Sequence, residues 1–267
     1  MSDDSQTLQP NAILGKAFTI RDLALEMLWC APGTFTMGSP SNEVERSFDE
    51  KQYAVTLTQG YWLGKHEVTQ AQWKEIMGSN PSNFKGANLP VEQVSWDEAT
   101  SFCANLTERE RKAGRLPEGY AYQLPTEAQW EYACRAGAKT AFSFGDSLSS
   151  RQANFDGNYP YGGAAKGVSP EKTSDVGSYP ANAWGFHDLH GNVWEWCQDW
   201  YGQYPNGSTR DPVGPAVGSR RVFRGGSWFN VAQYLRSANR YWREPDCRRS
   251  SLLGFRSSLR LVQGRAE

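Results

Sequence analysis

Glycine and proline place the tightest limit on what this chain can fold into. They make up 26 and 14 of its 267 residues, while 11 Trp, 12 Tyr and 12 Phe supply much of the apolar volume. Turns use glycine and proline, and long helices exclude both, so we expect short elements joined by extensive irregular loops. Large aromatic rings then fill the core. The pattern predicts a mixed α+β fold with little regular secondary structure.

Three helices are predicted by their first turns. Each begins with a hydroxyl residue that is followed three positions later by Gln or Glu, which is the spacing of a capping box. Apolar residues recur at helical spacing after each start, and a glycine ends each pattern. The three starts are Thr69 with Gln72, Ser95 with Glu98, and Thr126 with Gln129, and the three ends are Gly78, Gly114 and Gly137.

Short strands are expected before these helices. Residues 27–29 and 31–38 are expected to form two strands around a turn at Pro32 and Gly33, because this dipeptide favours a type II turn. Alternating apolar and polar residues predict a further strand over residues 53–58. Together these segments indicate an early antiparallel sheet.

The middle of the chain has almost no predicted regular structure. After Gly137, about 85 residues are rich in Gly, Asn, Ser, Tyr and Pro, and a loop of that length inside a compact domain must be pinned in place. Aromatic side chains, arginine side chains and a metal ion are the candidates. No linker composition divides the chain, so we expect a polar N-terminal tail over residues 1–17 and a single domain over residues 18–267.

The cysteines and the N-terminus indicate an unexported protein. Five cysteines, an odd number with no CxxC pair, exclude a disulfide framework and a zinc site made of cysteine pairs. The first residues lack the basic and apolar regions of a signal peptide, and no stretch approaches the roughly 20 apolar residues of a membrane-spanning helix. We therefore expect free thiols, a cytoplasmic location and no membrane partner.

Basic residues are concentrated at the C-terminal end. Residues 210–267 contain twelve Arg, no Lys and four acidic residues. Such a segment either binds anionic partners such as nucleic acid or uses its guanidinium groups as hydrogen-bonding forks that tie loops together. The structural role is favoured, because the net charge of the chain is -1 and no nucleic-acid-binding module is recognisable. We expect no nucleic-acid partner.

Seven ordered segments resemble the formylglycine-generating enzyme family, also called sulfatase-modifying factors. They are APGTFTMGS (31–39), GYWLGKHEVTQAQW (60–73), LPVEQVSWDEATSFC (89–103), YQLPTEAQWEYACRAG (122–137), GFHDLHGNVWEW (185–196), RVFRGGSW (221–228) and LGFRSSLRL (253–261). The resemblance covers nearly the whole chain. It implies a C-type-lectin-like α+β fold, which agrees with the composition.

The resemblance also implies where oxidase chemistry would occur. Oxidases of the family bind copper through two cysteines shortly after the GGS segment, and the matching positions here are Asn230 and Leu235. An amide and an alkyl group cannot replace thiolate ligands of a cuprous ion. We therefore expect no copper and no formylglycine-generating activity. The alternative is a metal-dependent oxidase or oxygenase of this family with a divergent site.

A related iron chemistry in the wider family requires several histidines. This chain contains His66, His187 and His190 alone, and glycines bracket the last two. The spacing of His187 and His190 suits metal ligands on a helix, but a turn is favoured here, so we expect structural roles and no iron.

A calcium site is implied at four positions just before and within the GNVWEW motif of residues 191–196. The family gathers oxygen ligands there, and the matching residues are Asp188, Gly191, Val193 and Glu195. Two carboxylates and two backbone carbonyls suit Ca²⁺. The alternative is that Asp188 and Glu195 accept hydrogen bonds from local amides.

The best candidate for a working surface is the segment 229–251. Aromatic and arginine side chains at this density are typical of binding hot spots. The same framework is similar to the variable proteins diversified by retroelements, whose ligand-binding surface is this stretch. We expect a protein or small-molecule ligand there, although about half of the rings are equally compatible with the core. The predicted binding residues are Phe229, Asn230, Val231, Gln233, Tyr234, Tyr241, Trp242, Arg243, Cys247, Arg248 and Arg249.

Overall fold

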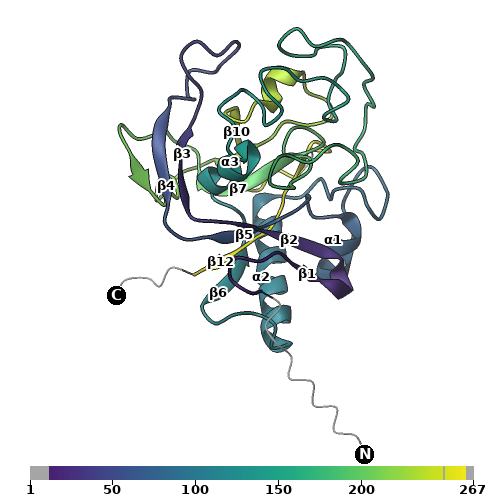
Figure 1. Cartoon of the computed structure of the whole chain (residues 1–267). Coiled ribbons are helices and arrows are strands. Elements are labelled where there is room, and N and C mark those ends of the chain that lie inside the picture. The colour runs from purple at the N-terminus through teal and green to yellow at the C-terminus, as the bar shows by residue number, and fades with distance from the viewer. Residues whose placement is uncertain (1–11, 249, 263–267) are drawn as a thin grey trace, which may run out of the picture.

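The computed structural model describes residues 12–248 and 250–262. All three predicted helices are present: α1 (Gln70–Met77), α2 (Trp96–Lys112) and α3 (Glu127–Arg135) (Figure 1). Each begins with the expected capping box, in which the hydroxyl accepts a hydrogen bond from the third backbone N–H and the third side chain accepts one in return. The start signals in the sequence are therefore confirmed.

A five-stranded antiparallel sheet joins the two ends of the domain. Its order is β1-β2-β5-β12-β6, so the last strand lies between two strands from the first half of the chain. Leu259 of β12 lies opposite Trp62 on one side and Tyr122 on the other. The strands are β1 (Phe18–Ile20), β2 (Leu25–Cys30), β5 (Tyr61–Gly64), β6 (Tyr120–Gln123) and β12 (Ser258–Leu261).

Two smaller sheets complete the framework. The four-stranded sheet has the order β10-β9-β7-β11 and the three-stranded sheet the order β3-β4-β8. Two 3₁₀ helices, η1 (Arg21–Leu23) and η2 (Ala232–Leu235), accompany them. The strands are β3 (Gly33–Met37), β4 (Tyr53–Leu57), β7 (Trp194–Trp200), β8 (Thr209–Arg210), β9 (Arg221–Arg224), β10 (Arg240–Arg243) and β11 (Leu253–Gly254).

The predicted strands near Pro32 and Gly33 exist, but they do not pair with each other. β2 pairs with β1 and β5, whereas β3 pairs with β4 in a different sheet. The connection between β2 and β3 therefore crosses between sheets. The predicted strand over residues 53–58 is β4.

Aromatic rings fill the core, as the composition predicts. Trp73 stacks on Phe102 with ring centroids 5.6 Å apart, and Phe255 meets both edge-on at 5.9 and 5.4 Å. These rings belong to the largest of three buried apolar clusters, which joins α1 and α2 to the five-stranded sheet. Such contacts bury large apolar area while needing few long elements.

The segment between α3 and β7 contains no helix or named strand over residues 137–193, all of which the structure describes. Single side chains hold it. The Asn182 amide donates to the carbonyl oxygens of Ala133 and Cys134 at 2.8 and 3.2 Å, and Arg256 donates to the carbonyl of His187 at 2.9 Å. Amide and guanidinium groups therefore anchor this long loop.

Two further predictions concern the chain as a whole. All five cysteines are free, and four of them are buried. Within residues 12–248 and 250–262, no helix combines the length and the apolar character needed to cross a bilayer. The boundary between the tail and the domain stays a prediction, since the first eleven and last five residues lie outside the described part.

The capping box of α2 leads to a stability prediction. Ser95→Ala removes the acceptor for the Glu98 N–H, so we expect a loss of about 1 kcal/mol in the free energy of unfolding, measured by urea denaturation. Ser101 lies on the exposed side of the same helix and provides the control, since Ser101→Ala should change this value by less than about 0.5 kcal/mol. Equal effects of the two substitutions would contradict the assigned cap.

Candidate functional site

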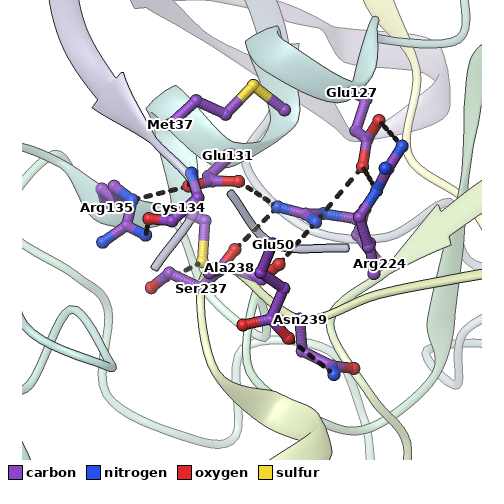
Figure 2. Close-up of polar contacts among 12 residues, drawn as sticks. Met37, Glu50, Glu127, Glu131, Cys134, Arg135, Arg224, Ser237, Ala238 and Asn239 are labelled. Carbon is purple, nitrogen blue, oxygen red and sulfur yellow. Dashed lines mark hydrogen bonds and ion pairs between the residues drawn. The ribbon is translucent and has the colours of Figure 1, made fainter. Parts of the chain in front are cut away.

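Arg224 at the end of β9 lies at the centre of a buried charge network (Figure 2). Its guanidinium contacts Glu127 at 3.3 Å and also pairs with Glu131, and it donates to the carbonyls of Ser237 and Ala238 at 2.8 and 3.0 Å. Its side chain is fully buried. A buried guanidinium requires this many acceptors, so Arg224 fixes α3 against the chain that follows η2.

Arg236 forms a second anchor of the same kind. It contacts both oxygens of Glu50 at 2.7 and 2.8 Å, Glu43 at 2.6 Å and the carbonyl of Glu45 at 2.9 Å. The guanidinium therefore ties the segment after β3 to η2. Bidentate geometry of this type is specific to arginine.

The basic C-terminal segment thus has a mainly structural role, which confirms the favoured interpretation of its charge. Four of its arginines are buried and form ion pairs with glutamates, namely Arg224, Arg236, Arg240 and Arg256. Arg248 is exposed and pairs with Glu98, while Arg249 lies outside the described residues.

The predicted calcium positions surround another arginine. Glu195 accepts from Arg256 Nε and Nη2 at 2.7 and 2.6 Å, and from Trp130 Nε1 at 2.7 Å. Asp188 accepts from the backbone N–H of Gly177 at 2.7 Å. These contacts do not fit a calcium ion on Glu195, because a guanidinium already lies against both of its oxygens and would repel a divalent cation. Calcium stays a prediction that this geometry does not favour.

A third carboxyl group lies close to this pair, and the sequence analysis missed it. Glu67 is fully buried, its Oε1 accepts from the Asn192 amide at 3.0 Å, and its Oε2 has no partner among the described residues. Burial, and next the charge of Asp188, raise the pKa of Glu67 well above its usual value. Burial likewise raises the pKa of Asp188 to about 6. Burial among other carboxyl groups therefore favours the protonated form of Glu67 relative to an exposed glutamate.

The two positions that match the oxidase cysteines are part of the framework. The Asn230 side chain accepts from Ser227 Oγ and N at 2.6 and 3.1 Å. Leu235 is fully buried, and a Cβ on Gly226 would lie 2.5 Å from its Cδ1. Both side chains serve packing and turn formation.

A cysteine and a histidine do meet near these positions. Cys134 Sγ lies 3.7 Å from His190 Nε2, but that nitrogen also accepts from the Ser143 N–H at 3.1 Å, and Nδ1 contacts the Leu235 carbonyl at 2.7 Å. Burial raises the pKa of Cys134 to about 12 and lowers that of His190 to about 4. A nucleophilic cysteine needs a low pKa and access to solvent, so this pair belongs to the core.

Metal ligands are not gathered elsewhere in the described part of the chain. No group of three or more His, Cys, Asp or Glu side chains is arranged to hold an ion there. His187 Nδ1 contacts the Tyr179 carbonyl at 2.8 Å, and its ring lies 4.9 Å from that of His66.

Part of the predicted binding segment forms an exposed face along β10, the edge strand of its sheet. Tyr241 is 47% exposed, and its ring stacks on that of half-buried Trp242 with centroids 6.0 Å apart. The Arg220 guanidinium lies 3.8 Å from the centre of the Trp242 ring, and Arg243 is exposed beside them. We call these four residues the β10 face. Arg220 was missed, because its contact with Trp242 depends on the pairing of β9 with β10, which no local sequence pattern shows.

The rest of the predicted segment divides between surface and core. Phe229 is 65% exposed and packs edge-on against Trp228. Three predicted residues at η2 are half-buried: Val231, Gln233 and Tyr234. The reason is that η2 packs Ala232 and Leu235 into the core, with the Tyr234 ring against them.

A series of backbone and side-chain contacts connects the segment at Phe229 to the β10 face. The Trp228 indole donates to the Ser251 carbonyl at 3.1 Å, and the next residue, Leu252, accepts from the Trp194 N–H at 2.7 Å. The Trp194 ring in turn lies 6.1 Å from Tyr241. Cys247, half-buried, accepts from Arg243 at 3.5 Å.

Comparisons with known proteins agree with this fold and these segments. The model of the sulfatase-modifying factor enzyme 1-like domain matches residues 18–261. The chain belongs to this family. A sulfatase-modifying relative, the formylglycine-generating enzyme of Streptomyces coelicolor, is 36% identical over 206 residues, which cover 73% of this chain and 60% of the relative. The mouse formylglycine-generating enzyme is 32% identical over 205 residues, covering 73% and 50%. The chain thus spans 50–60% of the length of these two relatives.

Solved structures extend the family likeness over nearly the whole chain. Treponema denticola variable protein 1 has a TM-score of 0.75 and 28% identity, covering 91% of this chain and 98% of that protein. PvdO from Pseudomonas aeruginosa also has a TM-score of 0.75, with 26% identity, covering 94% and 100%. The expected C-type-lectin-like α+β fold of the sulfatase-modifying family is confirmed.

The Arg256–Glu195 pair leads to a prediction about calcium. A cation that binds the folded state at 100 times its dissociation constant stabilises it by about 2.7 kcal/mol, which raises the unfolding midpoint by several degrees. Arg256 already occupies both oxygens of Glu195. We therefore expect chelator-treated protein to unfold at the same midpoint temperature with added calcium as with added magnesium at equal ionic strength. Differential scanning calorimetry measures this midpoint. A calcium-specific rise would instead support the four-ligand site predicted from the sequence.

Proposed function

We propose that this sulfatase-modifying-family domain is a non-catalytic binding module that takes a protein or small-molecule ligand on the β10 face. The positions matching the oxidase cysteines serve the framework, since Asn230 accepts hydrogen bonds from Ser227 and Leu235 is buried. Nearby in the sequence, by contrast, Tyr241 is 47% exposed and stacks on half-buried Trp242, which supports a binding role for this surface.

The β10 face has the physical properties of a binding hot spot. Aromatic side chains bury large areas with few rotatable bonds, so ordering them costs little entropy, and arginine adds directed hydrogen bonds. Trp242 is already held by Arg220 on its ring and by Tyr201 at 5.7 Å, and Arg220 is held by Glu244 at 3.2 Å. Side chains fixed before the ligand arrives favour affinity, because less freedom is lost on binding.

The likeness to the Treponema variable protein motivates a genetic extension of the proposal. According to this extension, residues 229–251 of the present chain are the diversified stretch of a retroelement cassette. Sequencing the flanking DNA tests this extension. A reverse transcriptase gene with a near-identical template repeat supports it, and their absence rejects it without affecting the β10 face.

A second candidate is favoured by the 36% identity to a formylglycine-generating enzyme. In that case the domain is a metal-dependent oxidase or oxygenase with a divergent site. The test is to incubate copper-supplemented protein with a cysteine peptide from a sulfatase, oxygen and a thiol reductant. Conversion of the peptide thiol to an aldehyde, detected by mass spectrometry, would establish the enzyme and reject the binding module as the main function.

The β10 face is tested by removing its two rings. We expect Tyr241→Ala combined with Trp242→Ala to reduce recovery of a specific partner from cells that make this protein at least tenfold, because hot-spot rings contribute about 2 kcal/mol or more each. Quantitative mass spectrometry of the captured material provides the measurement.

Tyr159 supplies the matched control for this experiment. It is an exposed tyrosine outside the β10 face, so Tyr159→Ala should retain capture. Circular dichroism should show that all variants are folded. Equal capture by the wild type and the double variant would reject the proposed surface.

A further inference from the structure

A cavity of about 340 Å³ lies beside the first turn of α3, apart from the β10 face. Strands β3 and β4 form one wall through Met37 and Tyr53, and the end of β7 with the chain after it forms another. Its volume is in the range of small-molecule sites.

One charged group in the lining has no ionic partner. Glu127 and Arg240 pair with each other through contacts of 2.8 and 2.7 Å. Asp199, which is 3% exposed, accepts the Glu127 backbone N–H at 2.8 Å through Oδ2. Its Oδ1 accepts no hydrogen bond and pairs with no cation within the described residues. Asp199 and Gly214 both line the cavity, and a Cβ on Gly214 would lie 3.2 Å from this oxygen.

Aromatic rings and prolines form the remaining wall. The rings of Tyr53 and Tyr204 lie 4.9 Å apart, and both hydroxyls are occupied, since Tyr53 donates to Met37 Sδ and Tyr204 to Glu127. Pro205, with Pro212 and Pro215, adds further apolar surface. The cavity therefore offers a single free carboxylate oxygen inside an aromatic and apolar enclosure.

We infer that this cavity binds a small primary amine with an apolar stem. An ammonium group donates to a carboxylate and is attracted to ring faces, while the stem replaces water on the apolar wall. A carboxylate ligand would be repelled by Asp199, and a neutral ligand would leave the buried charge unpaired. Burial, and next the charge of Glu127, raise the pKa of Asp199 to about 7.

Phenethylamine and phenethyl alcohol provide matched probes, because they differ at the polar end and share the ring. We expect phenethylamine to bind wild-type protein saturably in isothermal titration calorimetry at pH 8, and to bind more tightly than the alcohol. Asp199→Asn should weaken amine binding by about 10- to 100-fold, the usual effect of losing a charge-assisted hydrogen bond. The asparagine oxygen still accepts from the Glu127 N–H, so the start of α3 is retained.

Glu92→Gln is the matched control, because it also neutralises a buried carboxyl whose pKa is raised to about 7 by burial, away from this cavity. Its affinity for phenethylamine should equal that of the wild type. Equal binding of the amine and the alcohol by wild-type protein would overturn the inference, as would unchanged amine binding by Asp199→Asn. The amine-binding test and the partner-capture test of the β10 face use different residues, so the outcome of one does not decide the other.

Discussion

The bidentate pair between Arg256 and Glu195 is the contact on which most of the structure depends. Arg256 also donates hydrogen bonds to the carbonyls of Gly64, Lys65 and His187, at 2.9, 3.3 and 2.9 Å. One side chain thus joins the end of β5, the long loop and β7. The long loop has no helix or strand whose hydrogen bonds would hold its backbone in place. The hydrogen bonds of the Arg256 guanidinium hold it instead.

The same arrangement recurs at Arg224, Arg236 and Arg240, each of which binds carboxylates and backbone carbonyls from distant segments. Desolvating such charges is costly, and their net contribution to stability is often small. Their effect is geometric, because a fork with fixed donor directions accepts only one placement of the chain around it. With the framework fixed from inside, the exposed side chains of the β10 face need no role in holding the fold.

Local signals in the sequence predicted the helices well, because a capping box involves residues three positions apart. The strand pairing was not accessible in this way. β12 lies between β5 and β6, and β2 and β3 separate into different sheets at Pro32, which only the packing of distant segments decides. The fold family was predicted because seven motifs lie in order along the chain.

The candidate site was predicted less completely, for physical reasons. The density of rings singled out the segment 229–251 as a candidate, but it did not separate exposed Tyr241 from half-buried Tyr234, since burial depends on η2 packing. Asp199 was missed because an isolated acidic residue in a strand carries no pattern. The GNVWEW segment indicated carboxylates around a cation, and the structure places the Arg256 guanidinium against one of them.

Replacing Arg256 by lysine tests the central role of this fork most directly, because the charge is kept and the fork is lost. We expect Arg256→Lys to lower the free energy of unfolding by at least about 2 kcal/mol and to increase amide hydrogen exchange over residues 187–195. Arg243→Lys, at an exposed position, should leave both quantities unchanged. Wild-type stability and wild-type exchange in Arg256→Lys would contradict the account.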